Sequence, residues 1–193
     1  MKRICVYAGS SSGTREEFAS VARELGALLA KTGIGVVYGG ARVGLMGELA
    51  QAALSAGGEV IGVIPRFLVE KEVAHQGLTE LRVVSSMHER KRLMAELADG
   101  FVALPGGLGT LEEIFEMMTW SQLGLHRKPC GLLNAHGYYD SLIRMLEQMV
   151  EHGFVRRKHR ELVLVDRNAA ALLDKMRAFR PPELEKWLDA GEV

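Results

Sequence analysis

Short, continuously apolar runs alternate with longer amphipathic segments along most of the chain, and this alternation limits the possible folds more than any other feature. A strand that is apolar at every position suits a parallel sheet, because helices cover both faces of such a sheet. The amphipathic segments between the runs supply these helices. We therefore predict an α/β fold: a single doubly wound, Rossmann-like domain with a parallel sheet of about seven strands flanked by helices.

The pattern also places the individual elements. Strands are expected at residues 3–8, 35–38, 59–64, 81–84, 100–104, 130–133 and 162–165. Helices are expected near residues 15–31, 44–56, 87–98, 110–123, 139–152 and 168–179. A length of 193 residues with 48% hydrophobic content suits one core better than two, so one nucleotide-binding domain is expected over residues 1–180. The segment 181–193, which begins with two prolines, is expected to be a C-terminal appendage.

The charge balance excludes some classes of partner. Lysine plus arginine equals aspartate plus glutamate at 24 each, so no overall field favours nucleic acid or a membrane surface. The two cysteines, Cys5 and Cys130, fall in expected buried strands, where cysteine typically behaves as a small hydrophobe. No run of 18 apolar residues occurs, and the histidines lack metal-ligand spacing. We expect a soluble, cytoplasmic protein without a metal site or a cofactor.

Three of the expected strand-to-helix loops are rich in glycine and hydroxyl residues. They are AGSSSGTREE after the first strand, YGGARVGLMGELA after the second and LPGGLGTLEE after the fifth. Ligands of doubly wound sheets bind outside the carboxyl ends of the strands, and helix-start N–H groups attract anions. A glycine-rich turn without a ligand remains the alternative for any one loop, but three such loops favour an anion site. In the first loop, Thr14 and Glu17 are expected to form a capping box.

The glycine spacing narrows the identity of the anion. The P-loop pattern G-x-x-x-x-G-K-[ST] of nucleoside triphosphate sites is missing. The G-x-G-x-x-G spacing of dinucleotide sites, with an acidic residue about 20 positions further on, is missing as well. A monophosphate is therefore the favoured ligand.

Arg90 lies in an unexpected place on the helix expected at residues 87–98. It falls on the apolar face, between Met94 and Leu97, where an unpaired charge is costly. Its position near the helix start directs it toward the rim of the glycine loops. The alternatives are an arginine that extends along the helix to solvent, or one paired with a structural carboxylate. Lys91 lies at the edge of the same apolar face.

Glu113 allows two interpretations. With Thr110 it forms the pattern T-x-x-E, a capping box that satisfies helix-start amides without any chemistry. The same position also puts a carboxylate about one turn from the proposed phosphate cradle, where it could meet the sugar of a bound nucleotide. Glu112 and Glu116 are expected to point to solvent.

Two motifs together carry a resemblance to a known family. SMHERK at 86–91 and PGGLGTLEE at 105–113 resemble the M-H-x-R-K and P-G-G-x-G-T-x-x-E motifs of the LONELY GUY family, the cytokinin riboside 5'-monophosphate phosphoribohydrolases. The similarity extends from VYAGSSSG through NAHGYYDSL to about Gly153. It implies cleavage of the N-glycosidic bond of an adenosine 5'-monophosphate, with or without an N6 substituent, to the free base and ribose 5-phosphate. Members often bear the label lysine decarboxylase, but the sequence has no recognisable pyridoxal phosphate site.

The resemblance implies roles for individual residues. Arg90 and Glu113 are expected to be the catalytic pair. The expected substrate-binding residues, from the motifs and the glycine loops, are Glu72, Met87, Lys91, Gly106, Gly107, Leu108, Gly109, Thr110, Thr119, Gly9, Ser10, Gly40 and Gly44. The family is dimeric or larger, and a helix that carries Met117, Met118 and Trp120 is a candidate contact.

Glycosidic cleavage creates positive charge on the sugar, so a carboxylate such as Glu113 can stabilise it or activate water. An arginine pKa above about 12 suits Arg90 to holding the phosphate or orienting Glu113 rather than to acid catalysis. Two alternatives stay open: a nucleotide or molybdenum-cofactor carrier that does no hydrolysis, and a regulatory protein that senses a nucleotide.

Overall fold

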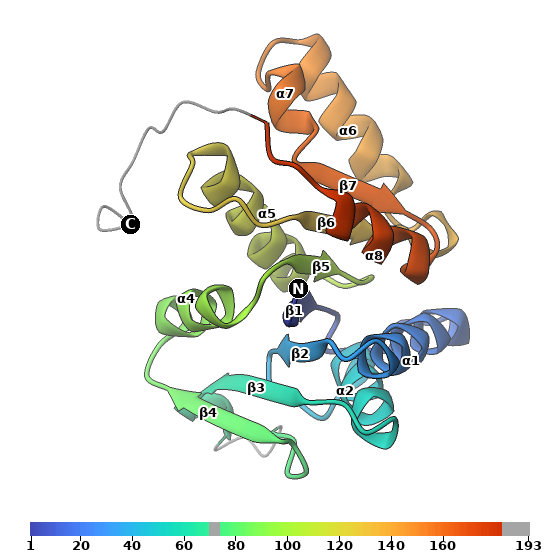
Figure 1. The fold of residues 1–193 in the computed structure, drawn as a ribbon, viewed down its shortest axis with the longest axis vertical. Helices are drawn as coiled ribbons and strands as arrows, with labels where there is room; N and C mark the ends of the chain where they lie inside the picture. The colour runs from blue at the N-terminus through green and yellow to red at the C-terminus, as the bar shows by residue number, and fades with distance from the viewer. Residues whose placement is uncertain (70–73, 183–193) are drawn as a thin grey trace.

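Seven parallel strands form one sheet, in the order β4-β3-β2-β1-β5-β6-β7 (Figure 1). The structure, a computed structural model, describes residues 1–69 and 74–182. The strands are β1 (Arg3–Tyr7), β2 (Gly35–Tyr38), β3 (Val60–Pro65), β4 (Glu80–Val84), β5 (Phe101–Ala103), β6 (Cys130–Leu133) and β7 (Val163–Asp166). The predicted α/β fold with a doubly wound parallel sheet is confirmed, and each strand agrees with its expected position to within two residues at either end.

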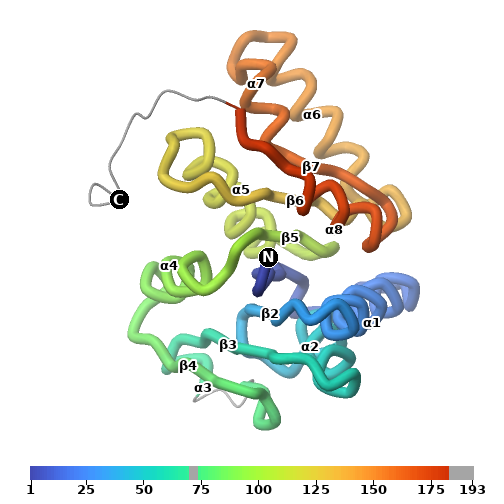
Figure 2. The backbone as a smooth tube through the Cα atoms, viewed as in Figure 1, coloured from blue at the N-terminus to red at the C-terminus, as the bar shows by residue number. Residues whose placement is uncertain are grey.

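Helices lie between the strands and cover both faces of the sheet. They are α1 (Glu16–Lys31), α2 (Gly44–Ser55), α3 (Arg66–Val69), α4 (Met87–Leu97), α5 (Leu108–Gln122), α6 (Asp140–Glu151), α7 (Arg157–Arg160) and α8 (Ala169–Ala178), with the 3-10 helix η1 (Ala135–Gly137). The six longer helices are those expected from the sequence. The short elements α3, α7 and η1 were not expected, because three or four residues are too few to show a helical period. The tube in Figure 2 shows α1 and α2 side by side.

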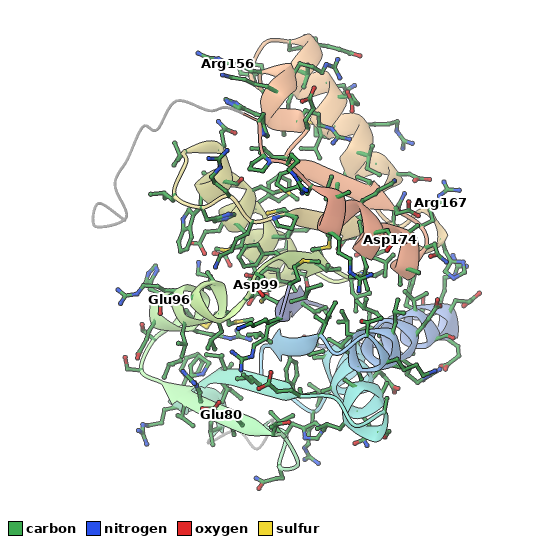
Figure 3. All side chains as sticks on the ribbon, in the orientation of Figure 1. Glu80, Glu96, Asp99, Arg156, Arg167 and Asp174 are labelled. Atoms are coloured by element: carbon green, nitrogen blue, oxygen red, sulfur yellow. The ribbon has the colours of Figure 1, made fainter. Side chains whose placement is uncertain are left out.

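Alternating side chains of the central strands enter two separate cores. In β1, Ile4 and Val6 pack with α1, α2 and α8, whereas Cys5 and Tyr7 pack with α4, α5 and α6. Burial on both faces explains why these strands are apolar at every position. Charged side chains such as Glu96 and Arg156 lie at the periphery (Figure 3). No helix within residues 1–69 and 74–182 is both long and apolar enough to span a lipid bilayer.

The order of the strands reverses at the centre of the sheet. Strands β1 to β4 follow one another in one direction, and β5 to β7 follow in the other, so the order reverses between β1 and β5. A doubly wound sheet has its ligand crevice at this switch point. The two loops that leave β1 and β5 are joined there, since the N–H of Gly9 donates to the carbonyl of Pro105 at 3.1 Å.

The helix caps differ from expectation. The capping box predicted at Thr14 and Glu17 is wrong, because α1 is preceded by Arg15 at the N-cap position and has no side-chain cap. A cap that was not predicted occurs at α4, where the Ser86 hydroxyl accepts from the N–H of Glu89 at 3.1 Å. Of the expected appendage, residues 183–193 lie outside the described part of the chain.

Close packing of α1 on α2 depends on Gly26. A Cβ at this position would lie 2.3 Å from the carbonyl oxygen of Leu49 in α2. We expect Gly26→Ala to lower the free energy of unfolding by about 1–3 kcal/mol, although alanine favours helix, because the added methyl forces the helices apart. Urea unfolding measures the change, with Gly109→Ala as a control because a Cβ there meets nothing within 4 Å. A Gly26→Ala protein as stable as the parent would contradict this packing.

Candidate active site

Arg90 lies inside the protein, on the face of α4 that packs against the sheet. Only 10% of its side chain is exposed. Its Nε donates to the carbonyl of Val63 at 3.1 Å, and its Nη2 donates to the carbonyl of Gly39 at 3.2 Å. Its Nη1 lies 3.5 Å from Oε1 of Glu113 on α5. The predicted apolar-face position is confirmed, and the guanidinium is held by the strand ends and by α5 and does not extend to solvent.

Gly39 is required by this arrangement, although it was not among the predicted site residues. A Cβ at Gly39 would lie 2.1 Å from Nη2 of Arg90, so any side chain there would displace the guanidinium. The available sequence signal is the Gly39-Gly40 pair directly after β2. Its partner lies 51 residues away, so the sequence alone does not identify the reason for the glycine.

Glu113 points into the protein beside Arg90. Its side chain is 12% exposed. Burial raises the pKa of this carboxyl from 4.5 to about 7, an effect that Arg90 opposes and Glu112 reinforces. The carboxyl therefore exchanges protons near neutral pH, which suits proton transfer.

The capping box predicted for Thr110 and Glu113 is wrong. Gly107 occupies the N-cap position of α5, so Thr110 lies inside the helix and is buried. A T-x-x-E pattern looks the same whether its threonine precedes the helix or lies within its first turn. Glu113 therefore has no capping contact to account for its inward position.

The PGG loop after β5 presents unpaired amides. No acceptor within the described chain binds the N–H groups of Gly106, Gly107, Leu108, Gly109 and Thr110, which we call the amide cradle. The first N–H groups of a helix carry partial positive charge, so five neighbouring unpaired donors favour an anion.

The glycines around the cradle fall into two groups. Gly106 is required by packing, since its Cβ would lie 2.1 Å from Oγ1 of Thr110. Gly44 has φ of +59°, and a Cβ there would lie 2.3 Å from the carbonyl carbon of Ser10. By contrast, a Cβ at Gly107 or Gly109 would meet no protein atom within 4 Å. At these two positions the surrounding protein gives no steric reason for glycine.

The remaining glycine-loop residues differ in their surroundings. Gly9 joins the β1 loop to Pro105, and Ser10 is exposed next to Gly44. Gly40 is packed against Ile64 of β3, so internal packing accounts for it.

Lys91 is held away from solvent by two carboxylates of α5. Its Nζ donates to Oε1 of Glu112 and, at 3.0 Å, to Oε1 of Glu116. Burial lowers the pKa of Lys91, but the two carboxylates outweigh burial and raise it above its usual value. The expectation that Glu112 and Glu116 are solvated is confirmed for Glu112, which is 54% exposed, and wrong for Glu116, which is 25% exposed. Both nevertheless pair with Lys91 and join α5 to α4.

The other expected substrate-binding residues are only partly brought together. Met87 is 37% exposed, with its Sδ 3.8 Å from Nη1 of Arg90, and Leu108 is 86% exposed at the start of α5. Thr119 lies on α5 about 16 Å from Leu108 along the helix axis. Its hydroxyl donates to the carbonyl of Phe115 at 2.8 Å. Thr119 is therefore not at the cradle of its own chain. Glu72 lies outside the described residues.

The expected contact helix also requires a correction. Met117 and Met118 are 0% and 7% exposed, so they belong to the core and are not available to a partner. Trp120 is partly exposed and lines a groove of about 930 Å³ between α4 and α5, together with Leu93 and Leu125. Within the described residues, no group of three or more His, Cys, Asp and Glu side chains is placed to hold a metal ion.

Comparisons with known proteins identify the family of the chain. The sequence profile of a family described as "Possible lysine decarboxylase" matches residues 46–176, which include Arg90 and Glu113. A probable cytokinin riboside 5'-monophosphate phosphoribohydrolase of Oryza sativa subsp. japonica is 49% identical over 93% of this chain and 79% of its own length. A cytokinin riboside 5'-monophosphate phosphoribohydrolase of Arabidopsis thaliana is 46% identical over the same shares.

A solved structure extends the comparison to the fold. The molybdenum cofactor carrier protein of Chlamydomonas reinhardtii superposes with a TM-score of 0.68 at 24% identity, over 92% of this chain and 98% of the carrier. At this identity the likeness shows a common fold and nothing about the ligand.

The raised pKa of Glu113 predicts a pH-dependent contribution to stability. Between pH 4.5 and about 7 the folded state binds more protons at this site than the unfolded state, so the site's contribution to stability falls as pH rises. Glu113→Gln cannot ionise, so we expect its unfolding free energy relative to the parent to increase by about 3 kcal/mol from pH 4.5 to pH 8, at 1.36 kcal/mol per pKa unit.

Urea unfolding at several pH values measures this difference. Glu96→Gln, which removes an exposed carboxylate from α4, is the matched control and should show no such trend. A difference between Glu113→Gln and the parent that does not change with pH would mean that Glu113 ionises as an ordinary surface carboxylate does.

Proposed function

The chain belongs to the family described as possible lysine decarboxylases, which it shares with the cytokinin riboside 5'-monophosphate phosphoribohydrolases, and we propose that it is itself a phosphoribohydrolase. The proposed reaction is hydrolysis of the N-glycosidic bond of an adenosine 5'-monophosphate, with or without an N6 substituent, to the free base and ribose 5-phosphate. One observation carries the proposal: Glu113, on the helix that begins at the unpaired amide cradle, is buried and paired with Arg90 of α4.

The 5'-phosphate is the part of the substrate that the cradle would hold. Unpaired N–H groups at the start of α5 supply donors and partial positive charge. The open space at Gly107 and Gly109 leaves room for phosphate oxygens to approach the main chain. Held in this way, the phosphate would position the sugar carbon C1' against Glu113, one to two turns along the helix.

In the proposed step, Glu113 activates a water molecule. The bond from C1' to the base nitrogen breaks with its electron pair leaving on the base, and positive charge develops on the ribosyl group. The water oxygen bonds to C1', Glu113 accepts the water proton, and that proton passes to the departing base. A pKa of about 7 lets the carboxyl accept and return a proton near neutral pH. Arg90 holds the carboxylate in place and retains its own proton throughout.

Decarboxylation of lysine fits the site poorly. A Schiff-base lysine must be available as a neutral amine. Lys91 is buried between Glu112 and Glu116, which raise its pKa and keep it charged, so it is unsuited to that role.

Turnover of AMP tests the proposed function directly. We expect purified protein to release adenine from AMP, to act much more slowly on adenosine, and to lose about 10²–10⁴ of its kcat in Glu113→Gln. Chromatography of the released base measures all three, and Glu96→Gln serves as the control. Equal turnover of AMP and adenosine would contradict the proposed role of the phosphate in binding. Adenine release unaffected by Glu113→Gln would leave the carrier interpretation standing.

We also propose that the protein works as a homodimer or larger homo-oligomer in the cytoplasm. The groove between α4 and α5 supports self-association, because its walls include the apolar side chains of Leu93, Trp120 and Leu125. Two free, buried thiols, Cys5 and Cys130, are compatible with a reducing compartment.

A charge in this groove is expected to separate the subunits. Trp120→Glu should convert the oligomer to a monomer in sedimentation velocity runs at micromolar concentration, because it would bury unpaired charges at the contact. An exposed substitution away from the groove, Arg156→Glu, is the control. A parent protein that sediments as a monomer would contradict the proposed assembly.

A further inference from the structure

The turn between β6 and α6 delivers two tyrosine hydroxyls to the PGG loop. Tyr139 Oη donates to the carbonyl of Leu104 at 2.5 Å, and Tyr138 Oη donates to the carbonyl of Gly106 at 2.6 Å. The carbonyl between them, that of Pro105, accepts from the N–H of Gly9. Three successive carbonyls of the loop are thus each held by a donor from a neighbouring strand end.

Holding these carbonyls fixes the direction of the amides. In a planar trans peptide the C=O and the N–H of the next residue point in opposite directions. The bond from Tyr138 to the carbonyl of Gly106 therefore sets the direction of the N–H of Gly107, at the centre of the amide cradle. Without such a bond the Gly106-Gly107 peptide would have wide rotational freedom, because neither residue has a side chain to restrain it.

The turn that carries the tyrosines is itself tightly constrained. Asn134 is buried, and its Oδ1 accepts from the N–H of Tyr139 while its Nδ2 donates to Oδ1 of Asp140, both at 2.7 Å. His136 adopts φ of +52°, a left-handed conformation that costs a non-glycine residue about 1 kcal/mol or more. Backbone strain of this kind persists where surrounding contacts over-determine the conformation.

The ring of Tyr138 is fixed independently of its hydroxyl. It packs edge-to-face against Phe18 of α1, with ring centroids 5.5 Å apart, and against Tyr139 at 5.0 Å. Although the residue is 43% exposed, its hydroxyl donates to the loop and is not left to solvent. Removal of the hydroxyl alone should therefore leave the turn and the ring contacts in place.

We propose that Tyr138 is a positioning residue of the amide cradle: its hydroxyl holds the carbonyl of Gly106 so that the N–H of Gly107 faces the phosphate of the substrate. Tyr139 supports the same loop two peptides further back, at Leu104. The inference rests on the proposed function in one respect, namely that the cradle binds a 5'-phosphate. Tyr138 acts only through the main chain and contacts neither the sugar nor the base.

Tyr138→Phe tests the role of the hydroxyl. We expect the Kd for ribose 5-phosphate and the KM for AMP each to rise about tenfold, with kcat changed less than threefold, because the amide that grips the phosphate is no longer held. The binding of adenosine, which lacks the phosphate, should be unchanged. Tyr38→Phe is the matched control, since it removes a buried hydroxyl that has no hydrogen-bond partner in the described structure. Equal weakening of AMP and adenosine, or no weakening of either, would overturn the proposal.

A readout that does not need catalysis keeps this inference separate from the proposed function. Amide NMR should show a lower order parameter for the N–H of Gly107 in Tyr138→Phe, because its peptide is no longer held, and titration with ribose 5-phosphate should shift that amide in the parent. If the parent binds ribose 5-phosphate without hydrolysing AMP, and Tyr138→Phe binds it tenfold more weakly, the proposed function fails and the positioning role stands. If the parent hydrolyses AMP and Tyr138→Phe matches it in KM, the positioning role fails and the function stands. A parent that neither binds nor hydrolyses would overturn both.

Discussion

The burial of one guanidinium governs the layout of the candidate site. A charged arginine inside the protein is tolerable only when it is hydrogen-bonded and paired with an opposite charge, because desolvation costs several kcal/mol. Arg90 meets this demand with the carbonyls of Val63 and Gly39 and with the carboxylate of Glu113. Each partner is constrained in turn: position 39 must be glycine, and Glu113 must face inward. One buried charge thereby joins β2, β3, α4 and α5.

The cradle depends on a second constraint, which acts on backbone and not on side chains. Carbonyls of the PGG loop accept from donors in the loop after β1 and in the turn after β6, which fixes its peptides, and the amides are unpaired because they lie at the start of α5. The glycines around the loop differ in the reason for which a side chain is absent. Gly106 is glycine because protein atoms crowd it, whereas Gly107 and Gly109 face open space. Only the second kind is informative about a ligand, since packing supplies no reason for it.

The sequence predicts the strands and the longer helices because their periods of hydrophobicity are local properties. It predicts Arg90 as a buried charge for the same reason. The errors arise where a local pattern has two structural meanings, as in the T-x-x-E of Thr110 and Glu113, where only the first residue of α5 decides between them. The sequence alone does not predict contacts between distant elements. Lys91 contacts its carboxylates only because α4 packs on α5, and Tyr138 bonds to Gly106, which lies 32 residues away in the chain.

The charge neutrality of the chain gives these local constraints their importance. With 24 basic and 24 acidic residues, the protein has no net charge to draw an anion from solution, so binding must rely on short-range contacts. Amides at a helix start meet this need without adding a formal charge next to Glu113. A lysine or arginine in the loop would bind phosphate as well, but it would also lower the pKa of the nearby carboxyl. Main-chain donors bind the anion through several weak dipoles that are fixed in direction. Burial therefore remains the dominant influence on the pKa of Glu113. The glycine-rich loop is thus a way to hold an anion close to an acid that must keep a pKa near neutrality.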